Sequence, residues 1–370
     1  MSELPPPPPG RHGWPWTEDA ASHAGGSHAA GSHEAASHAA APHAVAPHAA
    51  APHAGAPDDR LAPGDGWPRI TVVTPSYNQA QYLEETIRSV LLQGYPNLEY
   101  LVIDGGSDDG SRDVIRKYEA HLSDWVSEPD RGQSHAINKG FERATGDIHA
   151  YLNSDDVYEP GALHAVAAEF RAGAEWVSGD VRCWEEGVGS WPFPQLPGRG
   201  LAPWLLGCPI SQPGVFWSAR VHREAGPFRE DLDYVMDYEY WLRLRFRGVP
   251  LRRIAVPLAG YRMHGESKSV SRQQAMAREI RATIRAYEQR LTRAQHARLW
   301  LARRHRRGRV HGARALARLR ERRPVGAALE LGRALVQWPL LPLDPGAYEA
   351  LSARLREPAV PALFPDLWPE

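Results

Sequence analysis

Three groups of polar residues have types and spacing that suit the handling of phosphates, metal ions and protons. The first is the run 104–111 (Asp-Gly-Gly-Ser-Asp-Asp-Gly-Ser), and the second is the run 153–156 (Asn-Ser-Asp-Asp). The third is the run 236–239 (Met-Asp-Tyr-Glu). The first two directly follow short apolar runs, and the third begins a segment that we expect to be helical.

Each group has a chemical interpretation and a structural alternative. Glycines after Asp104 let a ligand approach the backbone closely, but a turn that caps the next helix would use the same residues. The neighbouring carboxylates of Asp155 and Asp156 repel each other, which a divalent cation such as Mg²⁺ or Mn²⁺ would relieve; a helix cap is the alternative. Asp237 lies among aromatic residues, where desolvation would make it a better general base, although acidic residues are also common where helices begin.

The elements that must position these groups alternate between strand and helix from Trp67 onward. We expect strands at 70–74, 100–103, 125–126 and 148–152, where β-branched and apolar residues run together. We expect helices at 81–92, 111–120 and 134–143, and another after Pro160. This order predicts an α/β fold with a mostly parallel sheet, helices on both faces and ligands at the carboxyl ends of the strands.

The combination of motifs resembles the family 2 glycosyltransferases with the GT-A fold. It comprises the run 74–78 (Thr-Pro-Ser-Tyr-Asn), the Asp-Gly-Gly-Ser that begins at Asp104, the run 132–140 (Gly-Gln-Ser-His-Ala-Ile-Asn-Lys-Gly), the Asn-Ser-Asp-Asp motif and Asp237. The resemblance extends from about Arg69 to His264. It implies a GT-A glycosyltransferase domain over 67–267.

The resemblance also implies roles for individual residues. Asp104 corresponds to the acid that contacts the base, and Asp155 to the metal ligand of the Asp-x-Asp motif. Asp156 is an alternate or helper ligand, His264 would join the metal or the diphosphate, and Arg262 could meet the diphosphate. The implied nucleotide-binding residues are, in full, Thr74, Pro75, Tyr77, Asn78, Asp104 and Asn153.

Asp237 corresponds to the catalytic base of an inverting transfer, and Met236 replaces a Glu that is common in the family. Gly105 and Asn153 are two further departures, each standing where an Asp is usual.

The implied reaction moves a sugar from a nucleotide-sugar donor, a UDP-sugar, to a hydroxyl of a glycan or lipid-linked acceptor in surface polysaccharide synthesis. A non-catalytic relative that binds nucleotide or glycan is an alternative, and so is a sugar nucleotidyltransferase, although the chain lacks a Gly-rich basic loop after its first strand.

The aromatic residues after Gln212 have two interpretations. Phe216 and Trp217 could shape an acceptor pocket, because aromatic faces stack on sugars, or they could pack in the core.

The first 66 residues differ from the rest of the chain. A His recurs every five residues from His23 to His53, set among Ala, Gly, Ser and Pro. Such a segment buries too little apolar surface to offset chain entropy, so we expect a disordered tail over 1–66. Weak binding of metal ions by the imidazoles is the alternative.

Composition narrows the class of protein. Two cysteines are too few for a disulfide framework, and no run is long and apolar enough to span a bilayer. No basic segment followed by an apolar one precedes the domain, as a signal peptide would require. We therefore expect a soluble cytoplasmic protein.

The near-neutral formal charge of −1 hides a basic C-terminal extension at 268–370. Between Arg272 and Arg323 there are 17 Arg and three Glu, and Met276, Ile280, Ile284, Tyr287 and Leu291 recur at helical spacing. This basic amphipathic helix could be ordinary solvated surface, or it could contact anionic lipid at the inner face of the plasma membrane. Nucleic acid is not an expected partner, because no recognised binding module accompanies the charge.

Overall fold

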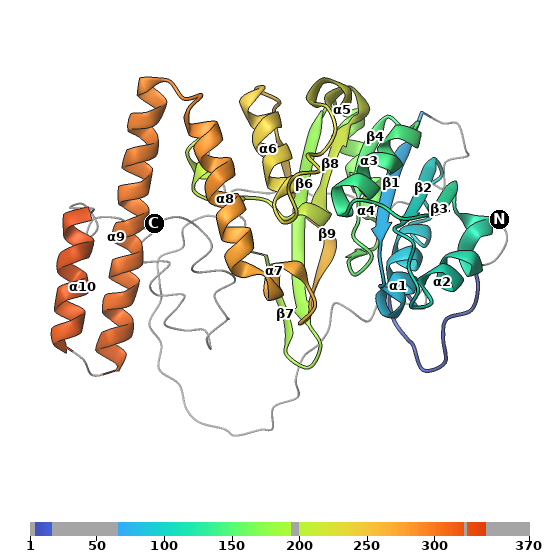
Figure 1. Ribbon diagram of the computed structural model, residues 1–370, viewed down its shortest axis with the longest axis horizontal. Helices are drawn as coiled ribbons and strands as arrows, with labels where there is room; N and C mark the ends of the chain where they lie inside the picture. The colour runs from blue at the N-terminus through green and yellow to red at the C-terminus, as the bar shows by residue number, and fades with distance from the viewer. Residues whose placement is uncertain (1–3, 17–65, 194–199, 322–323, 338–370) are drawn as a thin grey trace, which may run out of the picture.

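The computed structural model describes residues 4–16, 66–193, 200–321 and 324–337. A nine-stranded sheet lies at its centre, with strand order β3-β2-β1-β4-β8-β6-β9-β5 and with β7 paired to β6 (Figure 1). The strands are β1 (Ile70–Ser76), β2 (Leu98–Asp104), β3 (Asp124–Ser127), β4 (Ile148–Tyr151), β5 (Val157–Tyr158), β6 (Trp176–Glu185), β7 (Gly189–Pro192), β8 (Val215–Ser218) and β9 (Arg252–Met263).

The first four strands in this order are parallel, as the alternating pattern predicted. β1 pairs in parallel with both β2 and β4, and β2 pairs in parallel with β3. β8 then runs antiparallel to its neighbours β4 and β6. The mixed second half of the sheet carries the segment between β8 and β9, which contains Asp237.

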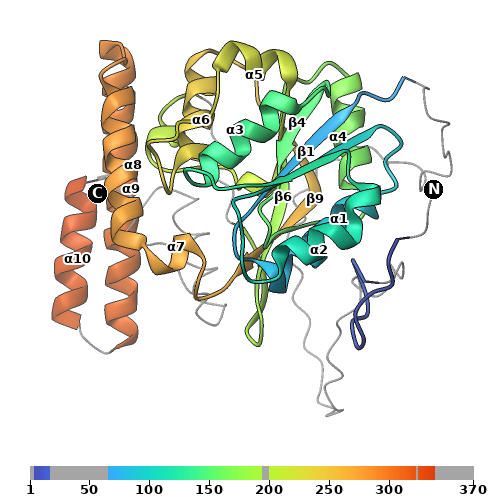
Figure 2. The same ribbon diagram turned by 45° about the vertical axis from the view of Figure 1, so that its right-hand side comes forward.

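Helices cover both faces of the sheet, so the expected α/β architecture is confirmed (Figure 2). Alternate residues of each strand enter different cores: in β1, Val72 joins one core and Val73 the other. One core includes side chains from α1 (Ala80–Leu91), α2 (Ser111–Tyr118) and α4 (Ala162–Arg171). The opposite core includes side chains from α3 (Gln133–Arg143), α5 (Ala219–Ala225) and α6 (Met236–Phe246).

The C-terminal helices are α7 (Lys268–Ser271), α8 (Gln273–Glu288), α9 (Arg293–Arg320) and α10 (Pro324–Gln337). The predicted apolar face of α8 exists, and Ile280, Ile284 and Tyr287 are buried in the same core as α6. α8 therefore packs against the sheet domain, and the domain boundary expected at 268 stays a prediction. The hairpin of α9 and α10 lies outermost, at the edge of both views (Figures 1 and 2).

Part of the segment that we expected to be a disordered tail is ordered: residues 4–16 pack on the domain. Arg88 of α1 is buried and donates hydrogen bonds to the carbonyl oxygens of Pro5 (2.7 Å), Pro15 (3.1 Å) and Trp16 (3.1 Å). Trp14 Nε1 donates to the carbonyl of Tyr158 at 2.8 Å. The histidine repeat lies outside the described residues.

None of the helices in the described ranges combines the length and apolar character needed to cross a bilayer.

Candidate active site

The predicted nucleotide-binding residues gather at one edge of the sheet because parallel strands end on the same side. Ser76, the last residue of β1, pairs with Asp104 at the end of β2, and Asp104 pairs with Ser127 at the end of β3. β4 ends at Tyr151, two residues before the Asn153 motif. The loops that follow β1, β2, β3 and β4 therefore meet at this edge.

The first predicted nucleotide-binding loop presents one exposed ring. Thr74 and Pro75 are buried in β1, and Thr74 Oγ1 lies 3.0 Å from the hydroxyl of Tyr100. Asn78 has a left-handed backbone (φ 51°) and joins two loops, since its N–H donates to Ser107 Oγ at 2.8 Å. Tyr77 is 62% exposed, so its ring is the part of this loop that is free to stack on a base.

Asp104 organises the turn after β2. Its side chain is fully buried, and Oδ2 accepts hydrogen bonds from the N–H groups of Gly106 (3.1 Å) and Ser107 (2.9 Å). The same oxygen accepts from Ser127 Oγ at 2.6 Å, and Oδ1 accepts from Ser107 Oγ. These bonds involve both oxygens of the carboxylate and hold the turn, and the contact of Asp104 with a base remains a prediction.

The departure at Gly105 lies where the Asp130 side chain approaches the backbone. A Cβ at this position would lie 2.7 Å from Asp130 Oδ2 and 3.2 Å from Tyr77 Cδ2. Asp130, in the loop between β3 and α3, thus brings a carboxylate next to Gly105 and Tyr77. Nothing in the spacing of the motifs indicated this residue.

Asp155 and His264 form the candidate metal centre. Asp155 Oδ2 lies 3.0 Å from His264 Nε2, and His264 Nδ1 is buried without a hydrogen-bond partner. Among the described residues, no group of three or more His, Cys, Asp or Glu side chains is placed to hold a metal by itself. One carboxylate and one imidazole nevertheless fit a divalent ion whose other ligands are substrate phosphates and water.

Asp156 occupies a more enclosed position. It is fully buried, and its Oδ1 accepts a hydrogen bond from the N–H of Arg262 at 3.0 Å. Burial, and secondly the neighbouring Asp155 carboxylate, raise the pKa of Asp156 well above its ordinary value. The contact with Arg262 stabilises the run 153–156, and the role of Asp156 as a metal ligand remains a prediction.

Arg262 holds the same motif. Its Nε donates to the carbonyl of Asp155 at 3.1 Å, and its Nη2 donates to Glu85 Oε2 at 2.8 Å. The guanidinium also lies over the rings of Tyr82 (4.9 Å) and Trp184 (4.7 Å). These contacts place Arg262 as a clamp on the Asp155 loop, and its contact with a diphosphate remains a prediction.

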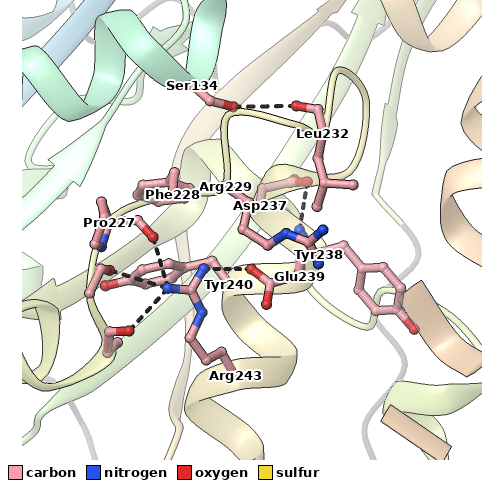
Figure 3. Close-up of polar contacts among 12 residues, drawn as sticks. Ser134, Pro227, Phe228, Arg229, Leu232, Asp237, Tyr238, Glu239, Tyr240 and Arg243 are labelled. Atoms are coloured by element: carbon pink, nitrogen blue, oxygen red, sulfur yellow. Dashed lines mark hydrogen bonds and ion pairs between the residues drawn. The ribbon is translucent and has the colours of Figure 1, made fainter. Parts of the chain in front are cut away.

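Asp237 lies in the first turn of α6 (Figure 3). Its Oδ1 accepts a hydrogen bond from the N–H of Tyr238 at 2.6 Å. Burial raises the pKa of Asp237 to about 6. A carboxylate with such a pKa is mostly ionised at pH 7 and still basic enough to take a proton efficiently.

The rest of α6 is anchored beside this group. Arg243 pairs with Glu239 one turn earlier and donates to the carbonyl of Pro227 at 2.8 Å (Figure 3). Phe216 and Trp217 are fully buried, so core packing is the correct interpretation for both.

Three further side chains contact the loops that carry the predicted residues; Gln133 lies in the run 132–140 but was given no role, and Lys268 and Glu279 lie outside the motifs. Gln133 of α3 donates to Asn153 Oδ1 at 2.7 Å and accepts from Lys268 Nζ at 3.3 Å. Glu279 of α8 accepts from the backbone N–H groups of Asp233 (3.1 Å) and Tyr234 (2.9 Å), in the loop before α6. A sequence signal existed for Lys268, because the chain has only three lysines and it follows His264 closely.

Several known proteins are similar to this chain. Residues 71–232 match the family model described as glycosyl transferase family 2. An uncharacterized glycosyltransferase of Nostoc sp. is 38% identical over 106 residues, which cover 28% of this chain and 33% of that protein. The putative teichuronic acid biosynthesis glycosyltransferase TuaG of Bacillus subtilis is 39% identical over 99 residues, 26% of this chain and 39% of that protein.

The chain thus spans between a third and two fifths of the length of these two relatives. Among solved structures, a mannosyltransferase from Pyrobaculum calidifontis in complex with GDP-Man and Mn²⁺ has a TM-score of 0.48 at 20% identity, covering 80% of this chain and 87% of that one. S. aureus TarS 1–349 in complex with UDP-GlcNAc also has a TM-score of 0.48, at 16% identity, covering 58% of this chain and 66% of that one. The match to the family model makes the chain similar, over residues 71–232, to the family 2 glycosyltransferases.

Proposed function

We propose that this protein is an inverting, divalent-metal-dependent glycosyltransferase. It moves a sugar from a nucleotide-sugar donor, a UDP-sugar, to a hydroxyl of a glycan or lipid-linked acceptor in cell-surface polysaccharide synthesis. The family match and the similarity to glycosyltransferases support the class of reaction. The single observation that carries the mechanism is Asp237, a partly buried carboxylate with a pKa of about 6 in the first turn of α6.

Asp237 acts as the general base. The acceptor hydroxyl loses its proton to the Asp237 carboxylate as its oxygen bonds to the anomeric carbon of the donor. The bond from that carbon to the diphosphate breaks on the opposite side, and the nucleoside diphosphate leaves. One displacement inverts the configuration at the anomeric carbon, and no covalent intermediate with the protein forms.

The donor lies across the loops at the strand ends. Tyr77 stacks on the base, and Asp155 and His264 hold the metal ion, which when bound offsets the negative charge of the leaving diphosphate. Asp156, Arg262 and their partners keep the Asp155 loop in place. Lys268 brings an ammonium group beside this loop through Gln133.

The test is a panel of nucleotide sugars, incubated with Mn²⁺ or Mg²⁺ and a broad set of acceptors, with release of nucleoside diphosphate measured. The wild type should turn over at least one donor, and Asp237→Asn should lose about 10²- to 10⁴-fold in kcat while still binding it. Donor binding without turnover by the wild type would favour a non-catalytic protein. Equal turnover by Asp237→Asn would remove Asp237 from the role of base.

A further inference from the structure

Exposed apolar side chains are concentrated on the α9–α10 hairpin. Nine of the eleven large apolar side chains that are exposed in the described ranges lie on these two helices. They are Trp300, Leu301, Val310, Leu319, Val325, Leu329, Leu331, Leu335 and Val336. Scattered single residues of this kind are ordinary on a protein surface, but such a concentration marks an interaction surface.

The two faces of α10 explain this concentration. Ala327, Glu330 and Ala334 recur at spacings of three and four residues, and all three are buried. Oε2 of Glu330 lies 2.7 Å from Nδ1 of His311, which belongs to α9. Val325, Leu329 and Val336 share a different face, at spacings of four and seven residues, and are 76%, 61% and 68% exposed. One face therefore binds α9, and the other is apolar and open to solvent.

The charge of α9 indicates what covers the open face. Its 28 residues include ten Arg and neither Asp nor Glu. Arg303 pairs with Glu288 and Arg306 donates to the carbonyl of Leu206, but the helix as a whole stays strongly basic. A second copy of the hairpin would bring another equally basic helix close to this one, and like charges repel. Anionic lipid headgroups complement the arginines, and the acyl region beneath them accepts apolar side chains.

Trp300 strengthens the case for a lipid surface. Arg304 lies over its ring, 4.9 Å from the centroid, and also donates to the carbonyl of Gln337 at 3.0 Å and to that of Val336. Arg304 thereby links the exposed indole to the C-terminal end of α10. Trp favours the boundary between lipid and water, because its ring is apolar and its N–H is polar.

We propose that the α9–α10 hairpin docks on an anionic phospholipid surface, with the open face of α10 entering the boundary between headgroups and acyl chains. The helices lie on the surface and do not span it. This assignment moves the lipid contact away from α8, whose apolar residues are buried in the sheet domain. It is independent of the proposed glycosyl transfer.

The experiment is co-sedimentation of the full chain with vesicles of pure phosphatidylcholine or of equimolar phosphatidylcholine and phosphatidylglycerol, at low and high salt. We expect the wild type to bind the anionic vesicles at least about tenfold more strongly than the neutral ones, and to lose part of that binding in high salt. The double variant Leu329→Glu/Val336→Glu should bind the anionic vesicles at least about tenfold more weakly than the wild type. Val188→Glu is the matched control, because Val188 is 61% exposed, like Leu329, but lies between β6 and β7.

Several results would overturn the proposal. They are failure of the wild type to bind anionic vesicles, equal binding by the double variant, and an equal loss in Val188→Glu. Light scattering adds a separate readout: a wild-type dimer that the double variant converts to a monomer, without any binding to vesicles, would assign the face to a second copy. Circular dichroism checks the fold, and if the double variant is unfolded, Val325→Ser should show the same weakening of binding.

Discussion

Asp155 and His264 are 109 residues apart in the sequence, yet Asp155 Oδ2 and His264 Nε2 lie 3.0 Å from each other. β9 ends at Met263 and delivers His264 to the loop that follows β4. A carboxylate oxygen and an imidazole nitrogen at this distance can bind one metal ion together. Arg262, two residues before His264, donates to the carbonyl of Asp155 and so helps to fix their relative position.

Replacing either ligand should therefore weaken binding of metal and donor together. For Asp155→Asn and for His264→Gln we expect the affinity for nucleoside diphosphate in the presence of Mn²⁺ to fall by at least about tenfold. Without metal, the variants and the wild type should bind nucleotide alike. Titration calorimetry measures both conditions, and Glu266→Gln, at an exposed carboxylate two residues from His264, is the control. A metal-dependent affinity that survives both substitutions would remove this pair from the metal centre.

The pKa of Asp237 predicts the acid limb of the pH profile. A base works only when it is ionised, so kcat should be constant above about pH 7 and fall roughly tenfold per pH unit below 6. Steady-state rates between pH 4.5 and 8, at saturating donor and metal, test this. The control Asp231→Asn, at an exposed carboxylate in the preceding loop, should keep the same midpoint. A wild-type rate that does not change across pH 6 would contradict the assignment.

Glu279 should act on the reaction through the loop before α6. Glu279→Ala frees the N–H groups of Asp233 and Tyr234, so we expect kcat to fall while the KM for donor changes little. The cost in unfolding free energy should be about 1 kcal/mol, and Glu279→Gln, which keeps one acceptor oxygen, should recover part of the rate. Glu288→Ala is the matched control, because Glu288 lies on the same helix but pairs with Arg303 of α9. Equal losses of kcat in Glu279→Ala and Glu288→Ala would indicate a general effect of α8.

Two buried histidines should make the fold sensitive to acid. Burial lowers the pKa of His149 to about 4 and that of His222 to about 3, and His149 has no hydrogen-bond partner on either ring nitrogen. Since the unfolded chain takes up these protons near pH 6.5, stability is complete above that pH and is lost as the pH falls towards 4. His149 alone should account for about 3 kcal/mol of this loss.

Urea unfolding at pH 7.5 and pH 5 measures that loss. His149→Leu should reduce the difference in unfolding free energy between the two pH values, whatever its effect on stability at pH 7.5. His121→Leu, at a partly exposed histidine outside this cluster, should leave the difference unchanged. A pH dependence that is identical in His149→Leu and in the wild type would show that the pKa of His149 is the same in the folded and the unfolded protein.

Gly105 and Asp130 should be coupled. Gly105→Asp alone forces a side chain against the Asp130 carboxylate, so we expect a loss of about 1–3 kcal/mol in unfolding free energy. Combining it with Asp130→Ala removes the obstacle, and the double variant should be more stable than the sum of the two single effects predicts. A thermodynamic cycle from urea unfolding measures this coupling. Strict additivity would mean that the loop after β3 moves aside without cost.

The parts of the structure that were predictable follow from local pattern. Apolar runs such as that of β1 indicated strands, and the parallel arrangement placed Asp104 and Asn153 at one edge. The spacing of Ile280 and Ile284 showed that α8 has a buried face, but periodicity does not tell which core that face joins. Nothing local to Gly105 indicated Asp130, because their contact depends on the path of a loop that lies 25 residues further along the chain. The packing of residues 4–16 was missed for the same reason, since its partner Arg88 belongs to α1.

The attachment of residues 4–16 has a consequence for the N-terminal part of the chain. Arg88 donates a hydrogen bond to the carbonyl of Trp16, and Asn97 donates one to the carbonyl of Trp67, just before β1. A single proteolytic cut between Trp16 and Trp67 would divide the polypeptide in two, yet the released N-terminal piece would stay bound through the Arg88 hydrogen bonds and the Trp14 contact.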